Sequence, residues 1–339
     1  MARSGVIYGG TGTFKTSQVK WLARHIALRT GKRTLLLSCD GGGWEPCRPE
    51  VEAGMISPFR VDSATVPLPM LQLVSRGYWP EHPDATSAAE LNFRQIDWRE
   101  VGAVAVEGWT SIGAVIMRYL PASGISVGGE DRTKLGGWSQ PVTVDGQVMN
   151  MNFLSNTRGD FGFVQNQLYG LVMNFNSLPC EYVLYTALES KTEDDDRTTI
   201  YGPSIPGKKA TSQCGAWVGD MIHAQDYQVP RVVHVANPDG KGEPVEQTVF
   251  DVVVRYFYKR HPDPATGILF PAKPRVAPEH IARLEEKFGG GYFEPTADGR
   301  DTFADYLALV DELAGQGGDA LRGWRERADA MLGRNSQVK

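Results

Sequence analysis

Short apolar runs and helix-like spacings alternate along the first half of the chain. The runs at residues 6–8, 34–37, 101–106 and 182–187 are short and continuous, which is typical of strands that are covered on both faces. Between the first two runs, apolar residues recur at helical spacing from Lys15 onward. A strand, a helix and a second strand in this order indicate a βαβ unit. We therefore expect an α/β fold with a mainly parallel central sheet flanked by helices.

Two polar segments and a helical end organise the rest of the chain. Residues 121–157 are rich in Gly, Ser, Thr and Asn and predict a long loop, with room for a hairpin at 142–148. Residues 189–213 are polar and charged and predict a second, mobile loop. The pattern after the last predicted strand is mostly helical. These observations predict a core over residues 1–277 and a helical C-terminal extension over 278–339.

Composition says more about the cellular compartment of the protein than about its function. The 339 residues carry a net charge of −5, which argues neither for nor against nucleic acid because a local basic surface would suffice. There is no apolar run of about eighteen residues that would predict a membrane span, and the first residues lack the apolar core of a signal peptide. Four scattered cysteines without a CxxC pair argue against zinc and favour packing roles in a reduced compartment. We expect a cytoplasmic protein without a membrane partner.

A glycine-rich segment directly after the first strand carries the strongest chemical signal. The phosphate-binding pattern G-x-x-x-x-G-K-[ST] is matched at Gly9, Lys15 and Thr16, with a strand before it and a helix after it. Such a loop binds phosphates through backbone N–H groups at a helix N-terminus, while the lysine reaches the β- and γ-phosphates and the threonine hydroxyl binds Mg²⁺. An accidental glycine-rich turn is the alternative. The predicted residues for binding ATP with Mg²⁺ are Gly9, Gly10, Thr11, Gly12, Thr13, Phe14, Lys15, Thr16 and Ser17.

One position departs from this pattern, because Phe14 stands where the second glycine is expected. If the backbone of Phe14 is right-handed helical, the ring can point away and the loop keeps its shape. If the position needs a positive φ, the substitution costs about 1 kcal/mol or more. The departure bears on the rate of hydrolysis more than on nucleotide binding.

Polar side chains that suit catalysis follow three of the apolar strands. A P-loop enzyme needs one carboxylate near Mg²⁺ and another to activate the attacking water. Glu107 ends the third strand in a Walker B-like run, and we assign it to the Mg²⁺ shell, with a solvated strand end as the alternative. Asp40 after the second strand is assigned to water activation, although a turn before three glycines explains it equally well. Thr186 in the fourth strand is a candidate γ-phosphate sensor or an ordinary strand residue.

The order of these motifs resembles the RecA-type ATPase core, and in particular the phage-encoded AAA-type ATPases. The likeness covers roughly residues 4–276 in short islands. The islands lie at residues 9–17, 35–40, 104–107, 185–187, 205–209 and 272–275.

The resemblance implies subunits that assemble into rings or filaments, with ATP between neighbours and a basic residue of one subunit completing the site of the next. Lys208 and Lys209 match the position of such a residue, Lys273 and Arg275 are further candidates, and surface lysines in a polar turn are the alternative. The resemblance also implies single-stranded DNA as a partner, in phage or prophage recombination, annealing or replication. The acidic run at residues 193–196 weakens that prediction because it would repel a phosphate backbone.

Three function classes follow from these observations. The leading hypothesis is a RecA-like P-loop ATPase in DNA metabolism. The second is a phage assembly or structural protein in which bound nucleotide is regulatory or structural with little turnover, which Phe14 and the acidic run favour. The third is a P-loop small-molecule kinase, against which the sequence shows no arginine-rich lid after the third strand.

Overall fold

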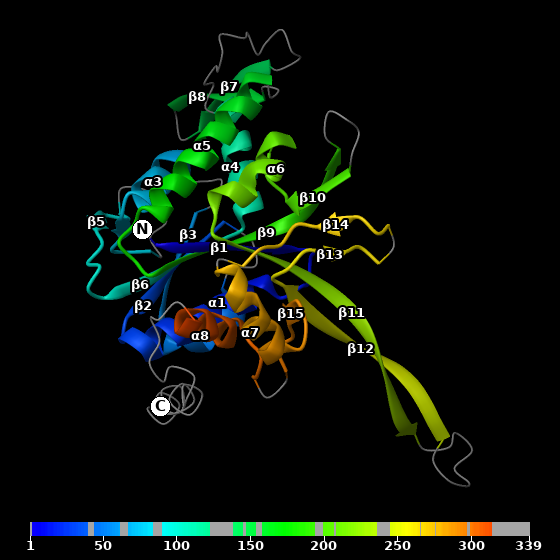
Figure 1. Cartoon of the computed structure of the whole chain (residues 1–339). Helices are drawn as coiled ribbons and strands as arrows, with labels where there is room; N and C mark the ends of the chain where they lie inside the picture. The colour runs from blue at the N-terminus through cyan, green and yellow to red at the C-terminus, as the bar shows by residue number, and fades with distance from the viewer. Residues whose placement is uncertain are drawn as a thin grey trace.

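The burial pattern of the first strand divides the core into two apolar layers. In the computed structural model, β1 (Arg3–Gly9) places Val6 and Tyr8 in one cluster and Ile7 in another, because successive side chains of a strand point to opposite faces. Helices cover both faces of the sheet that contains β1 (Figure 1). The structure describes residues 2–313 except 40–43, 62–66, 84–89, 123–137, 145–146, 154–157, 194–198, 207, 236–244, 265, 275 and 297–298.

The central sheet has nine strands and is mainly parallel. β1 lies between β9 and β11 and is parallel to both, and β6, β2 and β3 continue the parallel array beyond β9. The antiparallel additions are β12 on β11, β15 on β12, and β10 on β9. These features confirm the predicted α/β class with a mainly parallel central sheet flanked by helices, and they are consistent with a RecA-like core. The bounds are β2 (Arg33–Ser38), β3 (Ile56–Arg60), β6 (Val101–Glu107), β9 (Tyr182–Glu193), β10 (Thr199–Pro203), β11 (Asp220–Val235), β12 (Val245–Phe257) and β15 (Tyr292–Phe293).

Different helices cover the two faces. The face of Tyr8 is covered by α3, α4 and α5, whose buried residues include Leu71, Ile116 and Leu168. The face of Ile7 is covered by α1 and α8. The helices are α1 (Lys15–Thr30), α2 (Arg48–Glu52), α3 (Pro67–Ser75), α4 (Trp109–Ala122), α5 (Arg158–Asn176), α6 (Lys208–Trp217), α7 (Pro278–Phe288) and α8 (Phe303–Leu313), with a short 3₁₀ helix η1 (Glu45–Cys47). Three small antiparallel pairs join β4 (Tyr78–Pro80) to β5 (Phe93–Gln95), β7 (Trp138–Val144) to β8 (Gln147–Phe153), and β13 (His261–Pro262) to β14 (Leu269–Phe270).

The described residues between 278 and 313 belong to the same packing unit as the sheet. β15 pairs with β12 at the sheet edge, and α8 lies against α1. Phe303, Tyr306 and Val310 are fully buried in the cluster that contains Ile7. Over residues 278–313, the expected C-terminal extension therefore closes one face of the core instead of following it.

The expected mobile loop at residues 189–213 is wrong over its described part. β9 runs on to Glu193, β10 pairs with it antiparallel over residues 199–203, and α6 begins at Lys208. Charge and polarity suggested a loop, but a two-stranded extension tolerates polar side chains because both of its faces can meet solvent. The hairpin expected at 142–148 lies within the β7–β8 pair.

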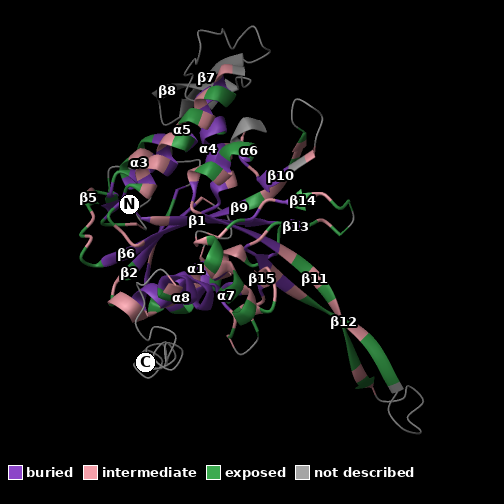
Figure 2. Ribbon diagram, viewed as in Figure 1, coloured by how far each residue is buried: buried purple, intermediate pink, exposed green. Residues whose placement is uncertain are grey.

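β11 and β12 continue beyond the sheet as a two-stranded ribbon (Figure 1). Their antiparallel register runs without interruption from the pair His223–Phe257 to the pair Val235–Val245. Burial falls along the ribbon, and Val232, Phe250 and Val252 are exposed in its outer part (Figure 2). Only the base of the ribbon therefore contributes to the core and to the site described next.

Candidate nucleotide-binding site

The segment between β1 and α1 has the geometry of a phosphate-binding loop. β1 ends at Gly9 and α1 begins at Lys15, so the loop leads directly into a helix N-terminus. A Cβ on Gly9 would lie 2.1 Å from the carbonyl oxygen of Ala224, and Gly12 has a φ of +83°. Thr13 is buried, and its hydroxyl donates to the carbonyl oxygen of Gly10 across 2.8 Å. Packing against Ala224 therefore requires glycine at position 9, and the backbone conformation favours glycine at position 12.

Phe14 occupies the left-handed region, with φ 50° and ψ 34°. Of the two conformations weighed from the sequence, the structure has the strained one, which costs about 1 kcal/mol or more for a residue with a Cβ. A hydroxyl from the far sheet edge holds this backbone: Tyr256 shares its proton between the carbonyl oxygens of Thr13 (3.0 Å) and Phe14 (3.2 Å). Gln18 donates to the same hydroxyl across 2.8 Å.

Lys15 lies over the loop. Its ammonium group donates to the carbonyl oxygens of Gly9 (3.1 Å) and Gly10 (2.6 Å) and to the hydroxyl of Thr13 (3.1 Å). Carbonyl oxygens are weaker partners for a cation than phosphate oxygens, since charged acceptors form stronger hydrogen bonds. The ammonium group of Lys15 therefore lies beside the place where a phosphate would bind, and a phosphate could replace its carbonyl partners.

Glu107 at the end of β6 meets two hydroxyls from neighbouring elements. Its side chain is buried, and it accepts hydrogen bonds from Thr16 in α1 and from Ser38 at the end of β2, the latter across 3.0 Å. Thr16 and Glu107 were both predicted as residues of one Mg²⁺ site, and Ser38 was not among the predicted residues. The adjacent strand ends bring all three together, because β2 and β6 pair in register at Ser38 and Glu107.

These oxygen atoms suit Mg²⁺, which prefers hard oxygen ligands and is commonly held by one or two carboxylates together with substrate phosphates and water. Within the described residues, no group of three or more His, Cys, Asp or Glu side chains gathers as a self-sufficient metal site.

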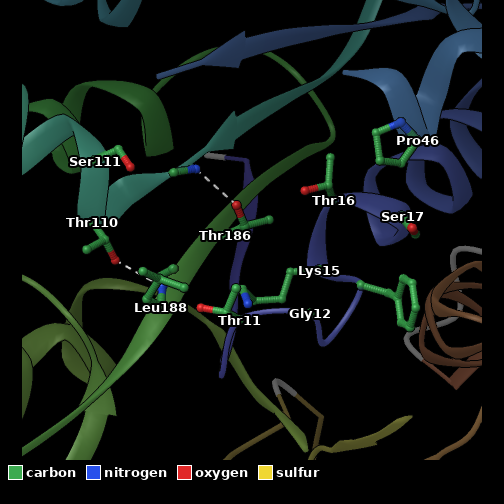
Figure 3. A pocket seen from close by; sticks show the side chains of 13 residues that line it. Thr11, Gly12, Lys15, Thr16, Ser17, Pro46, Thr110, Ser111, Thr186 and Leu188 are labelled. Atoms are coloured by element: carbon green, nitrogen blue, oxygen red, sulfur yellow. Dashed lines mark hydrogen bonds between the residues drawn. The ribbon is translucent and has the colours of Figure 1, made fainter. Parts of the chain in front are cut away.

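The middle of β9, at Thr186–Leu188, forms the opposite wall. The buried hydroxyl of Thr186 accepts a hydrogen bond from the backbone N–H of Gly108 across 3.1 Å. The hydroxyl of Thr110, in the first turn of α4, accepts one from the N–H of Leu188 across 2.9 Å. Figure 3 shows both bonds on the side of the pocket that faces Lys15. Thr186 thus lies where the sequence placed a candidate sensor, and its role as a sensor stays a prediction.

A cavity of ≈ 280 Å³ lies between these walls. Six of its thirteen lining residues carry a hydroxyl group and one is a lysine, while apolar atoms form most of the exposed lining (Figure 3). The lining residues are Thr11, Gly12, Phe14, Lys15, Thr16, Ser17, Pro46, Gly108, Thr110, Ser111, Thr186, Ala187 and Leu188.

The structure does not place the other predicted residues at the cavity. Asp40 and Arg275 lie outside the described residues. Lys208 and Lys209 are the first two residues of α6, and their side chains also lie outside the described part. Lys273 pairs with Met221 near the start of β11 and lines a groove with Ala2 and Ser4, at the end of the sheet opposite the phosphate loop. The assignments of these residues therefore stay predictions.

A buried polar chain beside β1 escaped the sequence analysis. Nε2 of His223 lies 2.6 Å from a carboxylate oxygen of Glu189, and Nδ1 of His223 lies 3.1 Å from Nε2 of His261. Burial, and secondarily the charge of His223, lower the pKa of His261 to about 4. Glu189 directly follows Leu188 of the cavity wall, so this chain links the wall to the base of the β11–β12 ribbon. Only strand pairing brings these residues together, and no local sequence signal marks them.

Comparisons with known proteins add little to this geometry. The sequence matches no family profile and no curated protein. Among solved structures, it is similar to one described as the crystal structure of the RadB recombinase, with 10% identity, a TM-score of 0.37 and coverage of 87% of each chain. That level of similarity does not transfer a function or the role of any residue. Among the described helices, none has the length and apolar character that crossing a membrane requires.

Proposed function

We propose that this chain binds ATP with Mg²⁺ in the cavity between the phosphate loop and the middle of β9, and that it is a P-loop ATPase of RecA-like type. The observation that carries the proposal is the hydrogen bond from Thr16, the hydroxyl of the phosphate-loop motif, to buried Glu107 on a separate strand. An accidental glycine-rich turn would have no reason to pair with a buried carboxylate at the end of β6.

The position of each residue in the cavity indicates its proposed role. The N–H groups at the start of α1 bind phosphate oxygens, and Lys15 exchanges its carbonyl partners for phosphate. Thr16, Glu107 and Ser38 would hold Mg²⁺, which neutralises charge on the phosphates when bound. The hydroxyl of Thr186, which accepts from Gly108, keeps its own proton to donate toward the terminal phosphate. Asp40 is proposed to orient the attacking water.

The setting in DNA metabolism rests on the order of the sequence motifs. We propose single-stranded DNA as the partner, assembly into a ring or filament, and action in phage or prophage recombination, annealing or replication. Lys208 and Lys209 are proposed to reach the site of a neighbouring subunit. A second function, a phage assembly protein with regulatory nucleotide and little turnover, is favoured by the left-handed backbone of Phe14 in the loop.

ATP hydrolysis with and without single-stranded DNA, at low and moderate salt, tests these proposals. The Lys15→Ala variant removes the phosphate contact, and Lys20→Ala is the matched control because Lys20 lies in the same helix with its ammonium over Trp21. Turnover that rises with DNA, falls with salt and disappears only in Lys15→Ala supports the DNA-directed ATPase. Nucleotide binding without turnover in every condition would favour the assembly protein, and unchanged activity in Lys15→Ala would contradict the site.

A further inference from the structure

Phosphate binding does not explain why a phenylalanine stands at position 14. Phe14 is 62% exposed, although it is a large apolar residue directly before α1. Its backbone is left-handed, so a glycine at this place would give the same loop without strain. Strain of this kind persists where the surrounding structure imposes it, and it concentrates at ligand-binding sites.

The surrounding structure does impose this conformation. The hydroxyl of Tyr256 binds the carbonyl oxygens of Thr13 and Phe14 from the sheet side, and Gln18 binds that hydroxyl in turn. The carbonyl groups therefore point toward β12. Phe14 is exposed and is one of the residues that line the cavity.

The cavity suits the phosphates of a nucleotide better than a whole nucleotide. Its volume of ≈ 280 Å³ is at the lower end of the range for small-molecule sites, which runs from about 300 to 1,000 Å³. The nucleoside must therefore extend past the mouth of the cavity.

The direction of that extension follows from the polar groups. Thr16 marks the metal end and Thr186 the terminal-phosphate wall, so the nucleoside leaves on the side of Ser17 and Pro46 (Figure 3). Phe14 directly precedes α1, Ser17 lies in the first turn of that helix, and both residues line the cavity together with Pro46. Of the described residues that line the cavity, only Phe14 is aromatic.

We propose that the ring of Phe14 is a stacking platform for the nucleobase of the nucleotide whose phosphates bind the loop, an inference that rests on the proposed function. The ring offers a π-face to a flat base at the mouth of the cavity, where water would otherwise cover it. A second copy of the chain is the competing occupant of this exposed ring.

Competition between two ligands tests the proposal: ATP and inorganic tripolyphosphate, each with Mg²⁺, measured by calorimetry. Phe14→Ala removes the ring and keeps a Cβ in the left-handed region, Phe14→Gly removes both, and Phe14→Trp keeps an aromatic face. Phe161→Ala is the matched control because Phe161 is an exposed phenylalanine on α5. Stacking on an aromatic side chain changes affinity by about 10-fold per base.

The expected result is that both Phe14→Ala and Phe14→Gly weaken ATP binding about 10-fold while tripolyphosphate binding changes less than about twofold. Phe14→Trp and Phe161→Ala should bind ATP like the wild type. Equal losses for both ligands would mean that the ring only shapes the phosphate loop, and would overturn the proposal. A change in oligomeric state with no change in the ATP-to-tripolyphosphate ratio would also overturn it and assign the ring to a second copy. Failure of the wild type to bind either ligand would instead overturn the proposed function.

Discussion

The two ends of β1 handle buried polar groups in opposite ways. At its start, Arg3 donates to both carboxylate oxygens of Asp220 across 2.9 and 3.1 Å, and the hydroxyls of Tyr182 and Tyr306 donate to the same carboxylate. At its end, Gly9 leads into a loop whose polar groups face an open cavity. One strand of seven residues therefore connects a closed polar network to an open one.

The difference shows how polar groups can serve either stability or binding. The carboxylate of Asp220 is fully buried and its acceptors are engaged by this chain, so the network can only hold elements together. It joins the N-terminal strand to β11 and, through Tyr306, to α8. In the cavity, by contrast, the hydroxyls and the lysine are held in place by partners that a phosphate or a cation can replace. We expect substitutions at the closed end to change stability and those at the open end to change binding.

The largest effect is expected at the closed end. Asp220→Ala leaves the partly buried guanidinium of Arg3 without its closest carboxylate, with Asp311 remaining at 3.8 Å, and should lower the free energy of unfolding by about 3 kcal/mol. Urea unfolding followed by tryptophan fluorescence measures it. The ATP affinity of the fraction that remains folded should be unchanged. A decrease in the free energy of unfolding of less than about 1 kcal/mol would contradict the claim that the polar network at the start of β1 serves stability.

The next effect is expected at the open end. Glu107→Ala removes the carboxylate that orients Thr16 and Ser38, and should weaken Mg²⁺-dependent ATP binding by about 10- to 100-fold, as loss of a metal-orienting group does. The free energy of unfolding should change by less than about 1 kcal/mol, because a buried carboxylate is removed together with its desolvation cost. Glu100→Gln is the matched control, since Glu100 is an exposed acid just before the same strand. If Glu107→Ala lowered the free energy of unfolding by several kcal/mol as well as the ATP affinity, Glu107 would be a stabilising residue like Asp220.

A smaller effect is expected from the chain that joins the cavity wall to the ribbon. The pKa of His261 is lowered from 6.5 to about 4, first by burial and then by the charge of His223. The unfolded chain takes up this proton near pH 6.5 and the folded chain only near pH 4, so the stability contribution is complete above pH 6.5 and is lost as the pH falls toward 4.

Between pH 7 and pH 5, His261 should account for a loss in unfolding free energy on the order of 1–2 kcal/mol. Urea unfolding at several pH values measures the slope, and His261→Asn should flatten it. A slope that is the same in the variant would place the titration elsewhere.

The smallest effect has the opposite sign. Phe14→Gly should raise the free energy of unfolding by about 1 kcal/mol, because glycine adopts a positive φ without strain. Phe14→Ala should show little of this gain, since alanine keeps the Cβ. Thermal unfolding without nucleotide compares the three proteins. If the glycine and alanine variants had equal free energies of unfolding, the positive φ of Phe14 would not be the cause of a lower stability in the wild type.

The parts of the site that the sequence predicted are those carried by local patterns. The phosphate loop follows from a strand, a glycine-rich turn and a helix in direct succession, and Glu107 follows from an apolar strand that ends in an acid. Ser38 and Tyr256 could not be predicted, because their contacts depend on strand pairing between segments far apart in the chain. The conformation of Phe14 stayed open for the same reason, since a tyrosine more than two hundred residues away imposes it.

The fold shows the same division. The parallel sheet was predictable because continuous apolar runs need helices on both faces. The segment 189–213 was mistaken for a loop because its polar residues hide a strand pair and a helix. The surface that α8 covers could not be predicted, because an amphipathic helix does not reveal whether it packs on its own core or on a partner.

The central claim is that the cavity is a site for ATP with Mg²⁺, and calorimetric titration of ATP tests it most directly. We predict binding by the wild type that weakens at least about 10-fold when EDTA replaces Mg²⁺, that persists in Lys20→Ala, and that is lost in Lys15→Ala. Binding of equal strength in Lys15→Ala, or binding that is indifferent to Mg²⁺, would contradict the claim.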